Sequence, residues 1–353
     1  MKKTSTSISQ IIKDAKKGKI FILVDDKDRE NEGDLVVSAS KINAKKINFM
    51  AKHGRGLICL ALTSAKVKKL NLPLMSLINR SRTQTAFTVS IESKKGITTG
   101  ISAFDRAKTI KVAIKPSSTK KHIVSPGHVF PLVAKAGGVL ERAGHTEASI
   151  DISKLAKLNP SAVICEVMNE DGTMARYKDL VPFAKKHKLK IAKIEDLISY
   201  RLKTERLIKK TSQKKINIKH FGTFDLKIFK NKLDGSEHYA ITKGKFSSSK
   251  PSRVRVISTN ILNNFLNFNK NLFKSSLNYL KKYNNFALIL VKGNNPITSS
   301  SGTGKILRYY GIGAQIIKEL NIKKMILVSR SKKRIIALKG YGLKIKRQEI
   351  IRQ

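Results

Sequence analysis

Residues 19–39 read KIFILVDDKDRENEGDLVVSA, and this stretch indicates the fold of the N-terminal half. Two short apolar runs, 20–24 and 35–37, flank a segment made almost entirely of charged residues. Apolar runs of about four to eight residues between polar turns are typical of buried strands. Similar runs recur further along the chain and alternate with helix-like patterns at 7–19, 180–187 and 194–203. The sequence therefore predicts a mixed α/β fold.

The charged segment 25–34 contains six acids in ten residues. Such a run is usually a solvated turn. It is also what a hard divalent cation requires, since Mg²⁺ is held by carboxylate oxygens and water. Arg29 lies among these acids, and solubility alone does not explain a guanidinium there. The combination indicates a site for a metal together with an anionic ligand.

Three other short segments carry groups that could take part in chemistry. Residues 142–147 (RAGHTE) combine an arginine, a histidine and a threonine around a glycine, which suits phosphate and metal binding. Residues 125–128 (SPGH) present a second histidine in a turn, and Glu166 follows the apolar run 163–165. An acid at a strand end can act as a base or can simply be exposed. Each segment alone also has an ordinary structural explanation.

Taken in order, these segments belong to a longer pattern. It consists of DRENEGD (28–34), GRGLIC (54–59), TAFTVSI (85–91), TTGISAFDRA (98–107), PGHVFPL (126–132), GGVLERAGHTEA (137–148) and ICEV (164–167). The order and spacing resemble the 3,4-dihydroxy-2-butanone 4-phosphate synthase family over about residues 5–202. The alternation in 85–91 by itself predicts a strand, and 94–105 a loop that enters a helix.

The resemblance implies the conversion of D-ribulose 5-phosphate to 3,4-dihydroxy-2-butanone 4-phosphate and formate, a step of riboflavin biosynthesis. It implies a homodimer with its active site near the subunit interface, and Mg²⁺ or Mn²⁺ held by Glu30 and His145, with Glu32 a further acid near the metal. His128 and Glu166 correspond to the catalytic residues. The implied contacts with ribulose 5-phosphate are Arg29, Glu30, Asp34, Arg142, Ala143, Gly144, His145, Thr146 and Glu166.

The composition changes near residue 201, and the segment 205–215 is a candidate polar linker. We therefore place one domain at residues 1–204 and a second at 205–353. Residues 216–350 resemble GTP cyclohydrolase II more faintly, chiefly through YGIGAQII (310–317). That family holds a catalytic zinc on three cysteines, whose place here is the Asn-rich stretch near 260–270. The chain has no cysteine after Cys165, so we expect a second α/β domain without zinc and without cyclohydrolase activity.

The net charge of +48 raises a different possibility. Residues 1–200 carry 37 Lys and Arg against 18 Asp and Glu, and residues 201–353 carry 35 against 6. A basic surface can bind nucleic acid, but these residues are scattered and follow no RNA-binding motif. We expect no nucleic-acid partner and a structural or regulatory role for the second half. Two alternatives remain: binding of nucleic acid or another anionic partner by that half, and a bifunctional enzyme.

Two cysteines cannot form a disulfide framework, and no apolar run is long enough to span a membrane. The sequence therefore predicts a cytoplasmic protein without a membrane partner.

Overall fold

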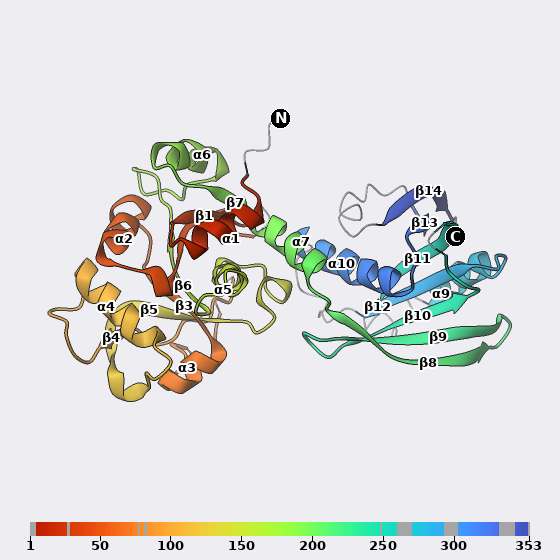
Figure 1. Cartoon of the computed structure of the whole chain (residues 1–353), viewed down its shortest axis with the longest axis horizontal. Coiled ribbons are helices and arrows are strands. Elements are labelled where there is room, and N and C mark those ends of the chain that lie inside the picture. The colour runs from red at the N-terminus through yellow and green to blue at the C-terminus, as the bar shows by residue number, and fades with distance from the viewer. Residues whose placement is uncertain are drawn as a thin grey trace. The chain divides into compact units, whose positions relative to one another are not determined.

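The computed structural model describes residues 5–26, 29–76, 78–80, 83–247, 249–259, 270–292, 303–331 and 343–351. Asp28 of the charged segment and most of the Asn-rich stretch, 260–269, lie outside the described residues. The chain divides into two compact units, Met1–Ile198 and Ser199–Gln353, each built on a seven-stranded sheet (Figure 1). Both units combine strands with helices, so the mixed α/β prediction is confirmed.

The sheet of the N-terminal unit brings the charged segment 25–34 next to Glu166. From edge to edge its strands are β4 (Ile91–Ser93), β5 (Ile123–Ala134), β3 (Cys59–Thr63), β6 (Ser161–Glu166), β2 (Gly33–Ser38), β1 (Phe21–Val24) and β7 (Ile191–Lys193). Strands β1 and β2 are antiparallel, with Val24 opposite Gly33, so the acids lie in the connection between them. Strands β2 and β6 are also antiparallel, and their register places Asp34 opposite Glu166.

Helices cover this sheet. They are α1 (Ile8–Lys16), α2 (Ala44–Phe49), α3 (Ser64–Leu70), α4 (Ala103–Ile114), α5 (His145–Leu155), α6 (Tyr177–Lys186) and α7 (Ile194–Thr204), which continues into the second unit. Leu35, Val37 and Leu60 pack in one core with Ile47 of α2 and Ile110 of α4. Helix α5 contacts the same central strands, and β2 is buried along its whole length. Burial on both faces explains why these strands are almost continuously apolar.

Polar residues define where several helices begin. The side chains of Ser7, Thr63 and Ser102 accept hydrogen bonds from backbone N–H groups in the first turns of α1, α3 and α4. Helix α5 begins after Gly144, which offers no side-chain cap. Its first backbone N–H groups therefore have no partner from a capping side chain, and this end of the helix suits an anion. No helix among the described residues is long and apolar enough to cross a membrane.

The strand predicted at 85–91 is wrong for most of that segment. Phe87 and Thr88 form only isolated bridges, to Leu132 and Leu74, and the regular strand β4 begins at Ile91. Burial does not follow the alternation of polar and apolar residues, because Thr88 is fully buried while Phe87 and Val89 are half-buried. At the start of the segment, Thr85 accepts a hydrogen bond from Arg142.

The second unit has its own mixed sheet. In spatial order its strands are β14 (Lys344–Ile350), β13 (Lys324–Ser329), β11 (Ser252–Thr259), β12 (Phe286–Lys292), β10 (Glu237–Lys243), β9 (Gly222–Asn231) and β8 (Ile208–Ile218). Among the described residues, its helices after α7 are α9 (Lys270–Leu280) and α10 (Thr303–Glu319), and α10 contains the YGIGAQII segment. Buried residues of α10, including Ala314 and Ile317, pack against Ala287 and Ile289 of β12.

The linker expected at 205–215 is wrong, because β8 occupies most of it. This strand pairs with β9 from Ile208 opposite Asn231 to Ile218 opposite Gly222. It is an edge strand and most of its side chains are exposed, so it shows no apolar alternation that would reveal it. Lysines on an exposed edge also oppose pairing with other chains.

Candidate active site

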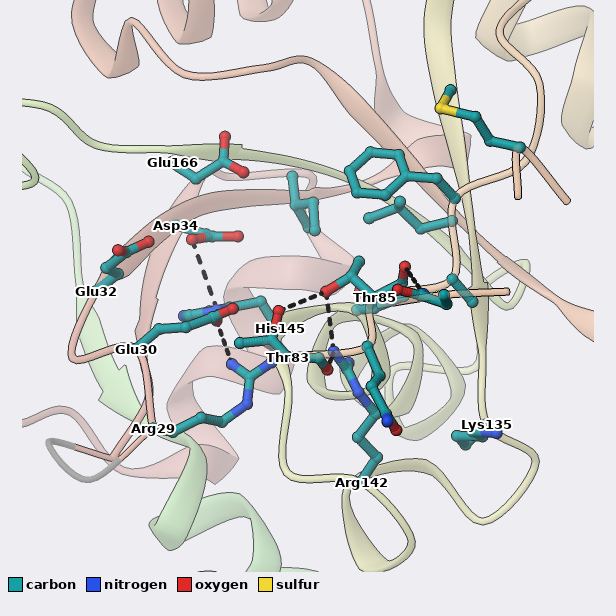
Figure 2. A pocket seen from close by; sticks show the side chains of 18 of the residues that line it. Arg29, Glu30, Glu32, Asp34, Thr83, Thr85, Lys135, Arg142, His145 and Glu166 are labelled. Carbon is teal, nitrogen blue, oxygen red and sulfur yellow. Dashed lines mark hydrogen bonds and ion pairs between the residues drawn. The ribbon is translucent and has the colours of Figure 1, made fainter. Parts of the chain in front are cut away.

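A cavity of about 630 Å³ opens in the N-terminal unit where the β1–β2 connection, the end of β6 and the start of α5 meet. Figure 2 shows carboxylates on one side of it and the cationic groups of Lys135 and Arg142 on the other. The residues that line it are Arg29, Glu30, Glu32, Asp34, Leu74, Met75, Ser76, Asn79, Thr83, Gln84, Thr85, Ala86, Phe87, Leu132, Lys135, Arg142, His145, Thr146, Ile164 and Glu166. This division of charge suits a ligand with a metal-bound end and an anionic end.

Asp25 organises the acidic connection from within. It is buried, and its carboxylate accepts hydrogen bonds from the backbone N–H groups of Glu30 at 3.1 Å and Glu32 at 2.9 Å. These bonds fold the connection back on itself, so that Glu30 and Glu32 both reach the cavity. Asp25 therefore has a role that the sequence pattern did not single out from the neighbouring acids.

His145, the first residue of α5, lies against these acids and is 6% exposed. Its Nδ1 atom is 3.8 Å from an oxygen of Glu30 and 3.7 Å from an oxygen of Asp34 (Figure 2). Its Nε2 atom is buried and has no hydrogen-bond partner among the described residues. Burying an unpaired polar atom is costly, so this atom marks the histidine as a side chain whose hydrogen bonding is incomplete.

The donor set fits a divalent cation. One ligand atom each from Asp25, Glu30 and His145 can be chosen so that all lie within 4.8 Å of one another. Ligands bound at about 2.1 Å in an octahedral shell are roughly 3.0 Å apart when adjacent and roughly 4.2 Å apart when opposite. The spacing of Glu30 and His145 lies between these values.

The electrostatic environment moves the pKa values of three neighbouring groups. Burial raises the pKa of Asp34 from 3.8 to about 8, and the charges of Glu166 and Glu30 act in the same direction. Burial raises the pKa of Glu30, but the interaction with nearby His145 and the charge of Arg29 prevail and lower it from 4.5 to about 2. Burial would lower the pKa of His145, yet the charge of Asp34 and the interaction with Glu30 raise it from 6.5 to about 9. Displaced pKa values around one cavity are typical of active sites.

Glu166 is held at the end of β6 by the GRGLIC segment. Its Oε2 atom accepts a hydrogen bond of 2.9 Å from the backbone N–H of Leu57. Gly56 passes so close that a Cβ atom there would lie 2.5 Å from the carboxylate and 2.7 Å from the backbone nitrogen of Glu166. Only glycine allows this approach, which explains why the segment carries a glycine at this position.

The opposite end of the cavity is built around Arg142. Its Nη1 atom donates to the buried carboxylate of Glu147 at 2.7 Å, and its Nη2 atom donates to the Thr83 carbonyl and the Thr85 hydroxyl, each at 3.0 Å. Gly144, beside Ala143, lets this guanidinium pass close to its Cα atom. Arg142 is thus oriented before any ligand arrives, next to the N-terminus of α5 and the buried Thr146.

His128 is the one predicted catalytic residue that lies away from these groups. It is on β5, does not line the cavity, and has a side chain that is 43% exposed. Its Nδ1 atom is hydrogen-bonded to Glu92 of β4. Its role remains a prediction.

Sequence patterns also left several cavity residues unassigned, among them Asn79, Thr83, Gln84, Thr85 and Lys135. Four of these five precede β4, and only Thr85 falls in the segment 85–91 that the alternation pattern assigned to a strand. The TAFTVSI segment (85–91) was a signal for Thr85 through the family resemblance, but no residue type in it points to ligand binding on its own.

Both units of the chain resemble known protein families. The family model of 3,4-dihydroxy-2-butanone 4-phosphate synthase matches residues 9–200, and that of GTP cyclohydrolase II matches residues 209–283 and 277–349. The chain is 43% identical to the riboflavin biosynthesis protein RibBA of Aquifex aeolicus, covering 96% of this chain and 90% of that protein. It is 42% identical to a 3,4-dihydroxy-2-butanone 4-phosphate synthase of Photobacterium phosphoreum, covering 97% and 98% respectively.

Two solved structures are similar as well. The two-domain 3,4-dihydroxy-2-butanone 4-phosphate synthase RibBX from A. baumannii has a TM-score of 0.86 at 38% identity, covering 98% of this chain and 100% of that one. A 3,4-dihydroxy-2-butanone 4-phosphate synthase in complex with two magnesium ions has a TM-score of 0.54 at 39% identity, covering 56% and 98%. The chain belongs to the 3,4-dihydroxy-2-butanone 4-phosphate synthase family and carries a second, GTP cyclohydrolase II-like domain.

Proposed function

We propose that the N-terminal unit converts D-ribulose 5-phosphate to 3,4-dihydroxy-2-butanone 4-phosphate and formate in riboflavin biosynthesis. The observation that carries this proposal is the cavity in which Glu30, His145 and Glu166 face the same space as Arg142. Family membership supplies the reaction, and the cavity supplies a place for it. The decisive assay is direct: purified protein with ribulose 5-phosphate and Mg²⁺ should release formate, and absence of release at saturating Mg²⁺ would refute the proposal.

Glu30 and His145 would hold the divalent cation, and Asp25 is a further ligand that the geometry adds. Mg²⁺ is the favoured ion, because carboxylates dominate the donor set, and Mn²⁺ would serve too. A bound cation withdraws charge from the substrate oxygens and so favours enolisation. Replacing Mg²⁺ by Mn²⁺ in the formate assay should preserve turnover.

The remaining residues divide between proton transfer and binding. Burial raises the pKa of Asp34, so its carboxyl group can hold a proton and donate it to the substrate. Glu166 is fixed by Leu57, so its carboxylate stays beside Asp34 and can exchange protons with substrate carbons. Arg29, Arg142, the backbone of Ala143 and Gly144, and Thr146 would bind the sugar phosphate. A phosphate at the start of α5 also gains from the helix dipole.

His128 requires a second subunit in this proposal. It lies outside the cavity, and the exposed apolar side chains of Ile101 and Phe104 belong to the segment that passes Glu92, its hydrogen-bond partner. Phe104 is 78% exposed, which is unusual for a side chain of this size. A homodimer that covers this surface would allow one subunit to supply His128 to the other's cavity.

A mixing experiment tests this arrangement. His128→Ala and Glu30→Gln subunits, each inactive alone, should regain part of the formate release when they are unfolded and refolded together. Such rescue requires that the two residues act in one site from different subunits. A stable, active monomer in light scattering would contradict the dimer.

For the second unit we propose a structural or regulatory role without GTP cyclohydrolase activity. The support is the sequence itself, which has no cysteine after Cys165 to hold a catalytic zinc. A bifunctional enzyme is the alternative, favoured by the likeness to the RibBA protein of Aquifex aeolicus.

A further inference from the structure

Arg29 lies inside the acidic cluster rather than beside it. Its Nη1 atom is 2.8 Å from Oδ2 of Asp25 and also contacts Oε2 of Glu30 (Figure 2 shows the second contact). The Asp25 side chain is fully buried, and the side chains of Arg29 and Glu30 are each 20% exposed. The charge of the two carboxylates is therefore already offset in part by a cation that belongs to the protein.

These are the same carboxylates that, with His145, form the candidate cation site. Oε2 of Glu30, which contacts Arg29, is also the oxygen that faces Nδ1 of His145. A divalent ion that takes this oxygen as a ligand repels a guanidinium against the same oxygen. Entry of the ion therefore favours a position of Arg29 further from Glu30.

From its position against the carboxylates, Arg29 already reaches Gly144. Its Nη2 atom lies 3.1 Å from where a Cβ atom of Gly144 would be, and Arg142 approaches the same glycine with its Nη1 atom. Gly144 precedes the N-terminus of α5 and offers it no side-chain cap, so two guanidinium groups and the first backbone N–H groups of the helix meet there, beside the Glu147 carboxylate. An anion bound at this point would attract Arg29 off the carboxylates.

We propose that Arg29 is a resident counter-ion of the acidic cluster, exchanged for the divalent cation when an anion binds at the start of α5. The inference rests on the proposed metal and phosphate sites. In this exchange the Arg29 side chain occupies two places one after the other. It lies against Asp25 and Glu30 before binding and against the anion afterwards. Because the exchange links the two sites, the anion should strengthen cation binding and the cation should strengthen anion binding by the same factor.

The test is a titration with Mn²⁺ alone. Binding is measured by calorimetry and by the electron paramagnetic resonance signal of the free ion. Arg29→Met keeps the length of the side chain and removes its charge. It should bind Mn²⁺ about tenfold more tightly than the unaltered protein, since the ion no longer has to break a charged hydrogen bond. Lys111→Ala, which removes one exposed charge on α4, is the control for a general change in field and should leave the affinity unchanged.

A second arm measures the linkage with sulfate, a tetrahedral anion that binds Mn²⁺ weakly in solution. Sulfate should tighten Mn²⁺ binding by the unaltered protein relative to chloride at equal ionic strength, and should have no effect on Arg29→Met. Arg29→Gln, which can still donate a hydrogen bond to Asp25, serves as a second neutral variant in case the acidic connection needs that bond to fold. Circular dichroism confirms that each variant is folded.

The outcomes separate this inference from the proposed function. Tight Mn²⁺ binding by both neutral variants, lost again on adding Glu30→Gln, supports the exchange. Binding by the unaltered protein that is no tighter in either neutral variant overturns it but leaves the metal site standing. Absence of Mn²⁺ binding in every protein overturns the metal site and the exchange together.

Discussion

The two units bury polar side chains in different ways. In the N-terminal unit, buried Asp25, Asp34 and His145 gather around one cavity and face one another. In the second unit, buried polar groups connect backbone segments instead: Gln315 bonds to the carbonyls of Leu202 and Glu205. The second unit has the larger excess of basic residues, yet the buried acids that gather around a cavity are in the first. Mutual proximity of buried charges, more than net charge, locates the chemistry.

The largest effect that tests this difference between the units should come from removing a proposed metal ligand in the N-terminal unit. We expect Glu30→Gln and His145→Ala each to reduce formate release by about 10³-fold or more, because the cation shell becomes incomplete. Both should also abolish Mn²⁺ binding in a titration. Lys111→Ala is the matched control and should retain full turnover. Near-normal turnover by either variant at limiting Mg²⁺ would remove these residues from the metal site.

For the second unit we expect an activity to be absent altogether. The purified protein should not convert GTP to the diaminopyrimidine product, with or without added zinc. General acid–base groups alone recover only about 10²–10⁴ in rate, far less than a metal-bound hydroxide supplies. Chromatographic detection of product is sensitive enough to decide. Zinc-dependent turnover that persists in Glu30→Gln would place an unrecognised metal site in the second unit and would make the protein bifunctional.

One tightly packed glycine in each unit allows the free energy of unfolding to be compared between the units. Gly56→Ala would push a methyl group against the backbone of Glu166, and Gly244→Ala would meet the carbonyl of Asn284 while straining a positive φ of 80°. Each should cost about 2–4 kcal/mol in free energy of unfolding. Only Gly56→Ala should also lower formate release at a temperature where both variants are folded. Equal losses of activity would mean that the second unit supports the site.

Much of the candidate site could be predicted because its residues are concentrated in short segments. Arg29, Glu30 and Asp34 lie within six positions, and Arg142 to Thr146 within five. Short sequence motifs were therefore enough to identify them as candidates. Contacts between distant residues could not be predicted. The bond between Leu57 and Glu166 and that between His128 and Glu92 depend on strand register, which no local pattern specifies.

The fold shows the same limit. Strands buried on both faces, such as β1 and β2, are apolar runs and were predictable. The edge strand β8 was mistaken for a linker because its stability comes from hydrogen bonds to β9, and lysines on its exposed faces give no periodic signal. The segment 85–91 was mistaken for a strand because its residues alternate between polar and apolar types, although most of them form no regular pairing and polar Thr88 is the buried one.

The smallest expected effect concerns an ion pair of the second unit. Glu349 of β14 accepts hydrogen bonds from Arg253 at 2.9 and 3.1 Å and from Tyr279 at 2.8 Å. Burial alone would raise the pKa of Glu349, but these bonds and that from Arg347 lower it below 4.5.

A carboxylate with a lowered pKa stabilises the fold above its unfolded pKa, and this contribution is lost as the pH falls below about 4.5. The side chains of Glu349 and Arg253 are both less than one-fifth exposed, so Glu349→Gln should cost about 1–2 kcal/mol at pH 7 and less at pH 3. Amide hydrogen exchange of β14 measures this locally, with Glu237→Gln on the exposed end of β10 as the control. Formate release should not change. A loss of protection in β14 that is as large at pH 3 as at pH 7 would show that Glu349 acts through packing and that its charge contributes nothing.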